Sequence, residues 1–450
     1  MPLKIAIIGA GPAGCTLARI LHIKDKSIQL TVFESEASIN FRSQGGTLDL
    51  HVGTGQLAIQ EAGLWDEFQK HARYDGEATQ IADKNYLCYV KVGAGNSGKS
   101  TSTGRPEIDR SLLRELLYNS LPKGMVQWSK KLKEVKRAGA ELELHFADGS
   151  TAHGYDLIVG ADGTWSKTRS LVTDIKPFYS GIAGHTMSIP DAATRHPALY
   201  DAVQRGSVYS YSDGKSLILQ QMGEGSLLVG TWSAHPADWQ QTAGYDVHDP
   251  VAVKAAYRKQ YADWHPTLRA FTQEADDATF AARDLFMLPI GNRWEHVPGI
   301  TLIGDAAHVM TPFAGEGVNL AFADCVDLSK AILSAAASLP SETSRTESPA
   351  TTTSQAAAGT ALDASVRAFE EIMFTRAKKY QQLTYDLMST VFFSPGAPRA
   401  VIERYLLRIV EASLGYWGRL LATPVVYAWF FVFKRICVGS AAFIFAVDGT

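Results

Sequence analysis

The sequence has few of the residues that hold disulfides or metal sites. It contains four cysteines, Cys15, Cys88, Cys325 and Cys437, which lie far apart and form no CxxC pair. Widely spaced cysteines are typical of proteins from a reducing compartment, and they give no support to a dense disulfide framework. They also give no support to metal binding, so we expect no metal ion.

The sequence also lacks an excess of charge of either sign. Its 43 lysines and arginines are balanced by 46 aspartates and glutamates, so we expect no basic surface and no nucleic acid partner. The start, "MPLKIAIIGAG", shows no basic stretch, long apolar run and cleavage site of a secretory leader. We therefore expect a cytoplasmic protein.

The uncharged run near the end is too short to be read as a membrane-spanning helix. It covers Leu420 to Phe433, "LLATPVVYAWFFVF", and is followed by Lys434, Arg435 and a second apolar run. A spanning helix needs about 20 apolar residues. We expect a helix buried on the body of the protein, and association with a membrane surface or a partner is the alternative.

What the sequence does contain is an alternation of strand and helix patterns. Its length suits two domains, and 46% hydrophobic residues are typical of a globular protein. The opening reads as a strand, "KIAIIG", a helix, "AGPAGCTLARIL", and a second strand, "IQLTVFE". This order predicts a βαβ unit with a parallel sheet, which is the Rossmann-like arrangement of an α/β domain.

Later segments predict a second domain inserted into the first. "ELELHFADGS" alternates like an antiparallel strand, and "SVYSYSDGKSLILQQMGEGSLLVGTWS" has three alternating runs, which predicts a β-meander. "GITLIGDAAH" then returns to the parallel-strand pattern. We expect a discontinuous first domain over 1–174 with 286–334, an antiparallel-sheet domain over 175–285 as the insertion, a flexible loop over 335–365 and C-terminal helices over 366–450.

The first motif that carries chemistry is a GxGxxG between the first strand and the first helix. Gly9 allows a tight turn, Gly11 lets a pyrophosphate approach the backbone, and Gly14 lets the helix pack closely on the strand. Glu34, twenty residues after Gly14, ends the second strand and is suited to accept hydrogen bonds from a ribose. Together these features predict a dinucleotide site, without distinguishing FAD from NAD.

The second motif is "GADGTWSKTR", which follows the apolar "DLIV". It places Asp162 and Gly163 at the carboxyl end of a strand, where α/β sheets bind ligands, although an Asp-Gly pair is also an ordinary turn. Arg169, in the same stretch, is a candidate to meet a phosphate or a nicotinamide cofactor.

The third motif is "GDAAHVMTPFAGEGVN". Asp305 is placed to bind a ribitol or ribose hydroxyl, and the glycine-rich stretch 315–319 brings backbone to a pyrophosphate or ring edge at a helix start. His308 titrates near neutrality, but we expect it to be structural rather than a general base. His185, in the middle region, is a still weaker pocket candidate.

In this order and spacing, the three motifs resemble those of single-component FAD-dependent aromatic hydroxylases, the para-hydroxybenzoate hydroxylase fold. The resemblance covers about residues 3 to 395. The stretches "GGTLDLHVGTGQLAIQEAGL" and "RPEIDRSLLRELL" are similar, more narrowly, to flavin monooxygenases that inactivate tetracyclines. The resemblance implies a Rossmann-like FAD-binding domain with an inserted antiparallel-sheet substrate domain and C-terminal helices.

The resemblance also implies a set of cofactor contacts. Arg42 stands where the tetracycline-inactivating subgroup has an arginine associated with NADPH and the flavin, and Arg110 is suited to pair with the pyrophosphate. We expect the following cofactor-binding residues: Gly9, Gly11, Ala13, Gly14, Glu34, Arg42, Asp49, Arg110, Asp162, Asp305, Gly315, Glu316, Gly317, Val318 and Asn319. No catalytic side chain is assigned.

The reaction that the resemblance implies needs two cofactors, FAD and NADPH. NADPH reduces the flavin, which binds O2 as a C4a-hydroperoxide and inserts one oxygen atom into an aromatic or polyketide-like small molecule. We expect a monomer. Two alternatives stay open: a flavin dehydrogenase or reductase that inserts no oxygen, and a flavin-bearing protein whose C-terminal tail binds a membrane or partner. The identity of the substrate, the choice among hydroxylation, epoxidation and Baeyer–Villiger insertion, and the choice between NADPH and NADH are also left open.

Overall fold

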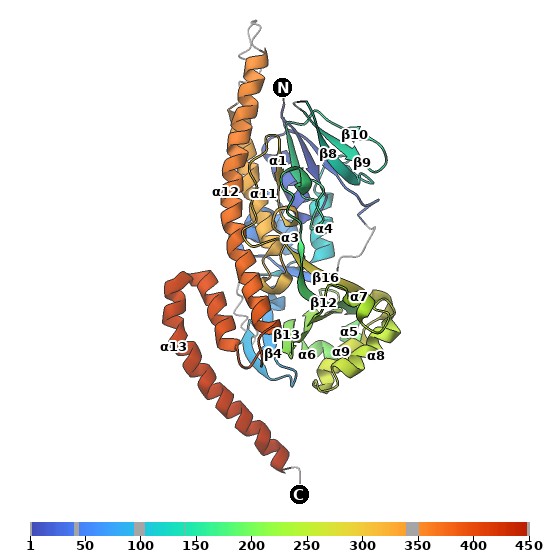
Figure 1. Ribbon diagram of the computed structural model, residues 1–450, viewed down its shortest axis with the longest axis vertical. Helices are drawn as coiled ribbons and strands as arrows, with labels where there is room; N and C mark the ends of the chain where they lie inside the picture. The colour runs from blue at the N-terminus through green and yellow to red at the C-terminus, as the bar shows by residue number, and fades with distance from the viewer. Residues whose placement is uncertain (1, 40–44, 94–103, 140, 339–350, 448–450) are drawn as a thin grey trace. The chain divides into compact units, whose positions relative to one another are not determined.

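The computed structural model describes residues 2–39, 45–93, 104–139, 141–338 and 351–447 (Figure 1). The chain divides into two compact units. The first unit comprises Met1–Glu77, Ser100–Ser180 and Phe286–Gln381, and the second comprises Ala78–Lys99, Gly181–Leu285 and Gln382–Thr450. Both units are therefore assembled from stretches that are far apart in the sequence.

The first unit is built on a parallel sheet of five strands in the order β17-β11-β1-β2-β7. These strands are β1 (Lys4–Ile8), β2 (Gln29–Phe33), β7 (Val126–Gln127), β11 (Leu157–Gly160) and β17 (Ile300–Leu302). The apolar residues of β1 alternate between two faces, as the pleat of a strand requires. Ile5 and Ile7 join one buried cluster, and Ala6 and Ile8 join another. The predicted parallel βαβ sheet is confirmed.

Helices cover one face of this sheet and a small antiparallel sheet covers the other. The helices are α1 (Pro12–Lys24), α2 (Leu57–Glu61), α3 (Trp65–Gln69), α4 (Arg110–Asn119), α10 (Asp305–His308), α11 (Gly317–Ala337) and the first part of α12 (Thr351–Phe392). The small sheet contains β8 (Leu132–Ala138), β9 (Glu141–Phe146) and β10 (Thr151–Ala152), so the alternating "ELELHF" is an antiparallel strand as predicted. A two-stranded ladder pairs β3 (Thr47–Asp49) with β6 (Glu107–Asp109).

The second unit is built on a seven-stranded sheet in the order β16-β12-β15-β14-β13-β4-β5. Its strands are β4 (Ala78–Ala82), β5 (Cys88–Val92), β12 (Phe178–Ile189), β13 (Gly206–Ser212), β14 (Lys215–Gln221), β15 (Leu227–Ala234) and β16 (Ala281–Met287). The predicted meander is confirmed, because β13, β14 and β15 pair in sequence as antiparallel neighbours. Its helices are α5 (Ala192–Arg195), α6 (Pro197–Ala202), α7 (Trp239–Thr242), α8 (Pro250–Gln260), α9 (Pro266–Glu274) and α13 (Ile402–Val447).

The structure differs from the expected domain map at two places. Strands β4 and β5 lie in the sheet of the second unit, although residues 78–92 were assigned to the first domain. The loop expected over 335–365 is helical up to Ala337 and again from Thr351. Alanine has the highest helix propensity, so a run such as "SQAAAGTALDA" extends a helix that is already nucleated by the packed part of α12. The low apolar content of 335–365 led to the prediction of a loop, which is wrong for the helical residues at both ends of this stretch.

Candidate functional site

Three glycine-rich loops that are far apart in the sequence meet at one edge of the parallel sheet. They follow β1, β11 and β17, which are adjacent in the sheet. Parallel strands place their carboxyl ends at the same edge, which is where open α/β sheets bind ligands. The backbone confirms the contact, because the Ala161 amide donates to the Ile8 carbonyl and the Ile303 amide donates to the Gly160 carbonyl.

In the first loop, two glycines are required by packing and a third borders open space. A Cβ on Gly14 would lie 1.9 Å from the carbonyl oxygen of Gly9, and a Cβ on Gly9 would lie 2.4 Å from that of Ala161. Gly9 also has φ +107°, which L residues rarely adopt. A Cβ on Gly11 would have no neighbour within 4 Å. Gly11 and Ala13 are half-buried, so the backbone at the start of α1 is accessible from outside.

Glu34 fastens this loop to the end of β2. Its Oε2 accepts a hydrogen bond from the Ala10 amide at 2.7 Å, and its Oε1 accepts from the amide of Glu36 at 2.9 Å and from the hydroxyl of Ser35. Each carboxylate oxygen has two lone pairs, so Glu34 keeps capacity for a further donor. The residue predicted to bind a ribose therefore also shapes the glycine loop.

The carboxylate of Asp162 is engaged inside its own loop. Its Oδ1 accepts from the Ser166 hydroxyl at 2.6 Å, and its Oδ2 accepts from the backbone amides of Lys167 and Thr168. Aspartate commonly accepts hydrogen bonds from nearby backbone amides in a turn. The alternative of a plain turn, left open in the sequence, thus has direct structural support at this side chain.

Arg169 joins the second loop to the third. The side chain is buried, and its guanidinium donates to the carbonyl oxygen of Thr164 at 2.7 Å and to that of Ala306 at 3.0 Å. We had considered this arginine for a phosphate or a nicotinamide. In the structure two of its donors hold backbone instead, because the loops between parallel strands leave carbonyls that need partners.

The third loop is anchored from behind by a buried group of charges. Asp324, on α11, accepts from the Gly304 amide at 3.0 Å, pairs with His308 Nε2 at 2.6 Å and pairs with Arg376 Nη2 at 3.0 Å. Burial disfavours the charged imidazole, but the Asp324 carboxylate outweighs it and raises the pKa of His308 above its ordinary value. The structural role expected of His308 agrees with this geometry.

Asp305 differs from this buried group in its exposure. Its side chain is exposed to solvent, whereas the neighbouring Ala306 and Ala307 are buried. The protein around it still removes enough water to raise the pKa of its carboxyl, and the positive charges of His308, Arg110 and Arg169 work against that rise. Asp305 is therefore an exposed carboxylate in a positively charged setting at the edge of the sheet.

The start of α11 presents bare backbone in the same way as the start of α1. Gly315 has φ +68°, and a Cβ on Gly317 would have no neighbour within 4 Å. Residues 315–318 are exposed or half-buried. Neither α1 nor α11 has a side-chain cap or an acidic residue in its first turn. The unpaired amides and the helix dipole at both ends thus favour an anion.

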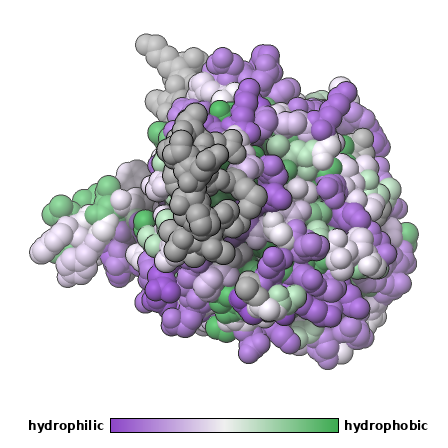
Figure 2. All heavy atoms as spheres, turned by 90° about the horizontal axis from the view of Figure 1, so that it is seen from above, coloured by the Kyte–Doolittle hydropathy of each residue, from purple (hydrophilic) through white to green (hydrophobic). Residues whose placement is uncertain are grey.

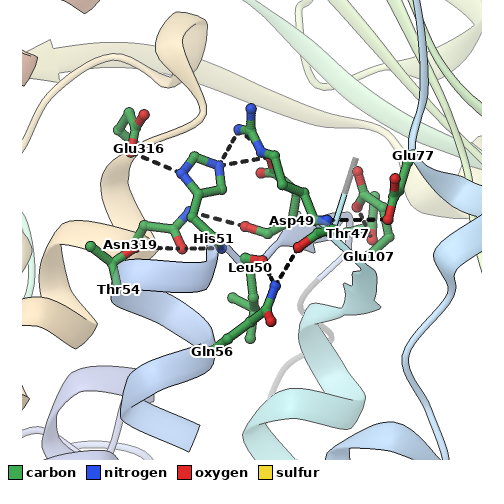
Figure 3. A network of polar contacts seen from close by, with 12 residues as sticks. Thr47, Asp49, Leu50, His51, Thr54, Gln56, Glu77, Glu107, Glu316 and Asn319 are labelled. Atoms are coloured by element: carbon green, nitrogen blue, oxygen red, sulfur yellow. Dashed lines mark hydrogen bonds and ion pairs between the residues drawn. The ribbon is translucent and has the colours of Figure 1, made fainter. Parts of the chain in front are cut away.

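A polar cluster connects the start of α11 with β3 and the π-helical turn η1 (Val52–Gln56) (Figure 3). In Figure 3 the His51 ring lies between Glu316 and Asp49. His51 Nε2 is 3.0 Å from Asp49 Oδ2, and its Nδ1 is 3.5 Å from Glu316 Oε2. Arg105 pairs with Asp49 at 2.7 Å and also contacts the His51 ring. The cluster, defined by these four residues, is called the His51 cluster below.

Charges within the His51 cluster shift the carboxyls in opposite directions. At Asp49, burial works against ionisation, but the hydrogen bond from His51 and the Arg105 charge outweigh it and lower the pKa. At Glu316 burial is the larger influence and raises the pKa, opposed by His51 and Arg105. Nearby, burial raises the pKa of Glu107 to about 7, although the Thr47 hydroxyl donates to it at 2.5 Å.

Asn319 is buried and its amide is used within the protein. Its Nδ2 donates to the Asp49 carbonyl at 3.0 Å, and its Oδ1 accepts from the His51 amide at 2.9 Å. Figure 3 shows this side chain directed at the segment that carries both residues. Asn319 thus joins α11 to β3, and both elements lie beside the exposed backbone of 315–318.

Three candidate residues remain: Arg42, Arg110 and His185. Arg42 lies outside the described residues, so its predicted role is unchanged. Arg110 is the first residue of α4 and is exposed; burial of its surroundings lowers the pKa of its guanidinium, and the nearby Asp305 opposes that shift. His185, the weak pocket candidate, is fully buried in the second unit and lies 2.6 Å from the Tyr257 hydroxyl, as expected of a packed histidine.

Sequence reasoning missed Asp324, His51 and Arg105 as positioning residues. Asp324 lies in the middle of a helix, where one acid gives no signal of a buried ion pair. His51 and Arg105 stand in the stretches that carry the resemblance, but they are 54 residues apart, and their contact exists only because β3 pairs with β6.

Comparisons with known proteins agree with this geometry. Residues 3–338 match a family model described as an FAD binding domain. The chain is 30% identical over 439 residues to monooxygenase penA of Penicillium thymicola, covering 88% of this chain and 96% of penA. It is 31% identical over 433 residues to monooxygenase asqM of Emericella nidulans, covering 85% of this chain and 94% of asqM.

A solved structure extends the comparison to the fold. The crystal structure of tetracycline destructase Tet(55) matches with a TM-score of 0.64 and 18% sequence identity, covering 92% of this chain and 97% of Tet(55). At that identity the likeness shows the fold alone. Taken with the family model and the two monooxygenase relatives, it confirms the resemblance stated from the motifs. The chain belongs to the FAD-binding-domain family and is an FAD-dependent monooxygenase of the para-hydroxybenzoate hydroxylase fold.

Proposed function

We propose that this chain inserts one atom of O2 into an aromatic or polyketide-like small molecule at the expense of NADPH. One observation carries the proposal: within a single unit, two uncapped helix starts with open glycines, at Gly11 and Gly317, lie on loops from the same sheet edge. Two such helix starts suit the pyrophosphate and the ring edge of a dinucleotide cofactor.

The residues present fit FAD. The backbone of Gly11 and Ala13 is accessible at the start of α1 and would hold the pyrophosphate. Glu34 keeps lone pairs for the adenosine ribose, and the exposed Asp305 would accept from the ribityl chain. The accessible backbone of 315–318 would contact the flavin ring. FAD, when bound, supplies the redox chemistry and the activation of oxygen.

Some of the predicted contacts are better assigned to the backbone than to side chains. The side chains of Asp162 and Asn319 form hydrogen bonds with protein groups. Asp49 is paired with His51 and Arg105. We propose that these three residues position the loops, and that Arg110 and Arg42 supply positive charge toward the phosphates. A positioning role predicts that their loss weakens FAD binding through altered loop geometry.

The His51 cluster links β3 to the start of α11. Asp49 and Glu316 flank one imidazole, and Glu316 is the residue directly before α11. An imidazole between two carboxylates holds the segments that carry them at a fixed separation. We propose that His51 keeps the backbone of 315–318 in the conformation that receives the ring.

Oxygen labelling tests the proposed reaction. The FAD-loaded chain is supplied with NADPH, 18O2 and a panel of phenolic and polycyclic compounds, and products are analysed by mass. We expect one compound to accelerate NADPH oxidation and to gain 2 mass units relative to the reaction in ordinary O2, the mass difference between the two oxygen isotopes. Oxidised or reduced product without label would instead identify a flavin dehydrogenase or reductase.

The electron donor and the setting are part of the proposal. NADPH and NADH are compared at equal concentration by the rate of flavin bleaching without oxygen, and a faster rate with NADH would contradict the NADPH assignment. Cys15, Cys88 and Cys325 are free thiols, which is compatible with the cytoplasmic location that we propose. We also propose that the chain is a monomer, which sedimentation equilibrium measures.

A further inference from the structure

The C-terminal helix α13 directs many large apolar side chains to solvent and forms ion pairs on the side that packs on the protein. More than half of the large apolar side chains that are exposed among the described residues lie on this one helix. Figure 1 shows α13 as a bent helix, and the bend coincides with Gly415, which has φ +72°. Figure 2 shows hydrophobic side chains, in green, on the segment that lies at the left in both views and that Figure 1 labels α13.

The side of α13 that packs on its own unit is the side that contains the ion pairs. After the bend, Phe430 is buried, and Ala422 and Val426, at a spacing of four residues, are half-buried with it. Lys434 donates to both carboxylate oxygens of Glu403, at 2.7 and 2.8 Å, on the first arm of the helix. The second arm is thus fixed against the first by charge and by a narrow apolar stripe.

The outward side of the same arm is apolar. Trp417, Leu421 and Val425, again four residues apart, are 72%, 76% and 68% exposed. On either side of this line, large apolar side chains are exposed as well: Leu420, Tyr427, Trp429, Phe431, Val432 and Ile436. By helical spacing, this set covers more than half of the circumference. The set of these nine residues is called the outer face of α13.

We propose that the outer face of α13 docks on the surface of a lipid bilayer that contains anionic lipids. A second copy of a helix covers a narrow seam, whereas this face is too broad for one partner helix and suits a continuous apolar medium. Tryptophan and tyrosine are enriched where acyl chains meet headgroups. The outer face contains Trp417, Tyr427 and Trp429. An interfacial helix buries such a face to the depth of the headgroup boundary.

The charge of the C-terminal segment indicates that the lipid is anionic. From residue 412 to residue 447 the sequence has three basic residues, Arg419, Lys434 and Arg435, and no acidic one. Arg419 pairs with Glu411 and Lys434 pairs with Glu403, so Arg435 is the one of the three that we assign to a headgroup. Arg435 is exposed and lies over the Phe431 ring at 4.2 Å. It follows Trp417 by 18 residues, or five helical turns, and so shares the side of the helix that carries the outer face. Basic residues beside an apolar helix face attract phosphate and carboxylate headgroups.

A cavity beside the bend adds a place for a headgroup. Its volume is about 350 Å³, and it is lined by Arg404, Arg408 and Arg419 together with three hydroxyl side chains and Asp386. Arg408 is paired with Asp386 at 2.6 Å, and Arg404 donates to the neutral hydroxyl of Ser394. Arg404 therefore retains positive charge toward the cavity.

In the part of the chain covered by the structure, no helix meets the length and apolarity required to cross a membrane. The proposal concerns attachment to one leaflet. Flotation of the FAD-loaded full chain tests it, with vesicles of phosphatidylcholine alone and with vesicles that also contain one quarter phosphatidylserine. We expect the chain to float with the phosphatidylserine vesicles and to float less with the neutral ones. Absence from both vesicle fractions would overturn the proposal.

Two matched double variants locate the attachment. Leu421→Ser with Trp429→Ser removes two side chains of the outer face, and Val251→Ser with Ile372→Ser removes two that are comparably exposed on other helices. We expect the first pair to weaken vesicle binding at least tenfold and the second pair to leave it unchanged. Bound FAD, read from the flavin absorbance, should be the same in both. Equal loss in the two variants would contradict a role for α13.

Two further measurements test the role of basic residues and the alternative that a second copy of the chain covers the outer face. Arg404→Gln and Arg435→Gln should each weaken binding to phosphatidylserine vesicles about fivefold, as expected for one basic residue near an anionic surface, without changing binding to neutral vesicles. If the parent chain instead sediments as a dimer that ignores vesicles, and the Leu421→Ser, Trp429→Ser variant is a monomer, the outer face is an interface between copies and the lipid proposal fails.

Discussion

The loops of the first unit and the helix α13 of the second unit both have charged side chains that are paired within the protein. They differ in the groups that they expose to solvent. In the first unit, Glu34 after β2, Asp162 in the second loop and Asp324 on α11 accept hydrogen bonds from backbone amides of the three loops. In α13, Glu403 and Glu411 pair with lysine and arginine of the same unit. The loops are left with bare amides at helix starts, whereas α13 is left with bare apolar side chains.

In both regions, the groups left for a ligand depend on which polar groups are already paired inside the protein. Charges that are satisfied internally fix a shape and are then unavailable to a ligand, so the ligand must match what remains. Amides at the start of α1 and α11 match an anion, and the outer face of α13 matches an acyl layer. The comparison would be weakened if the inward charges were dispensable or if the outward groups contributed to folding.

The largest expected effect comes from the inward charges of the first unit. Asp324→Ala leaves buried His308 and Arg376 without their shared carboxylate, which should lower the free energy of unfolding by about 3–5 kcal/mol. Denaturation with urea measures it. Asp327→Ala is the control, because Asp327 pairs with the same arginine at 2.6 Å but is partly exposed, and should cost less than about 1 kcal/mol. Equal costs would mean that burial does not distinguish the two acids.

The second effect concerns the bare backbone of the first loop. Gly11→Val adds atoms where no neighbour lies within 4 Å, so the apoprotein should fold with its stability nearly unchanged. The added side chain would occupy the approach to the backbone, and we expect FAD affinity to fall by about 100-fold, roughly 3 kcal/mol. Gly359→Val, at another open glycine on α12, is the control. Flavin fluorescence titration reads both, and unchanged FAD affinity in Gly11→Val would remove Gly11 from the site.

The third effect is the pH dependence of Glu107, which lies beside the His51 cluster. Burial raises the pKa of Glu107 from the ordinary 4.5 to about 7, so folding favours the protonated acid. Its contribution is complete below pH 4.5 and is lost as the pH rises through 7. Glu107→Gln stays neutral, so relative to the parent it should gain about 1–3 kcal/mol between pH 5 and pH 8, at about 1.4 kcal/mol per pKa unit. Melting curves that stay parallel across that range would contradict the raised pKa.

The smallest effect is expected at the outer face of α13. Trp429 and Phe430 are adjacent, but Trp429 is 65% exposed and Phe430 is 3% exposed. Trp429→Ser should change the free energy of unfolding in water by less than about 0.5 kcal/mol, whereas Phe430→Ser should lower it by about 3 kcal/mol. Urea denaturation in the absence of lipid compares them. A large cost at Trp429 would show that the outer face belongs to the core.

Much of the first unit could be predicted because its signals are local. The turn at Gly9 and the close packing at Gly14 are properties of neighbouring backbone, and a glycine at such a position is visible in the sequence. The period-two pattern of β1 and of the meander strands is local as well. The helix over 351–365 was missed because weak apolar content hides a segment that propagates from a packed helix.

The positioning contacts could not be predicted because they join residues across the fold. Asn319 reaches a carbonyl 270 residues earlier in the chain, and Arg169 reaches one 137 residues later. No periodicity or spacing reports such a pair, since it depends on which strands become neighbours.

The dinucleotide site, the three loops and most strands and helices follow from the sequence alone, because glycine positions and hydrophobic periodicity act over short stretches of backbone. The tertiary structure alone decided which polar atoms were left for a ligand. Asp162 and Asn319 stay predicted cofactor contacts, and the fold adds that their side chains hydrogen-bond protein groups. The apolar run 420–433 read as a buried helix until the fold showed its broad side in water. A side chain's availability depends on what lies around it, and only the packed chain sets that.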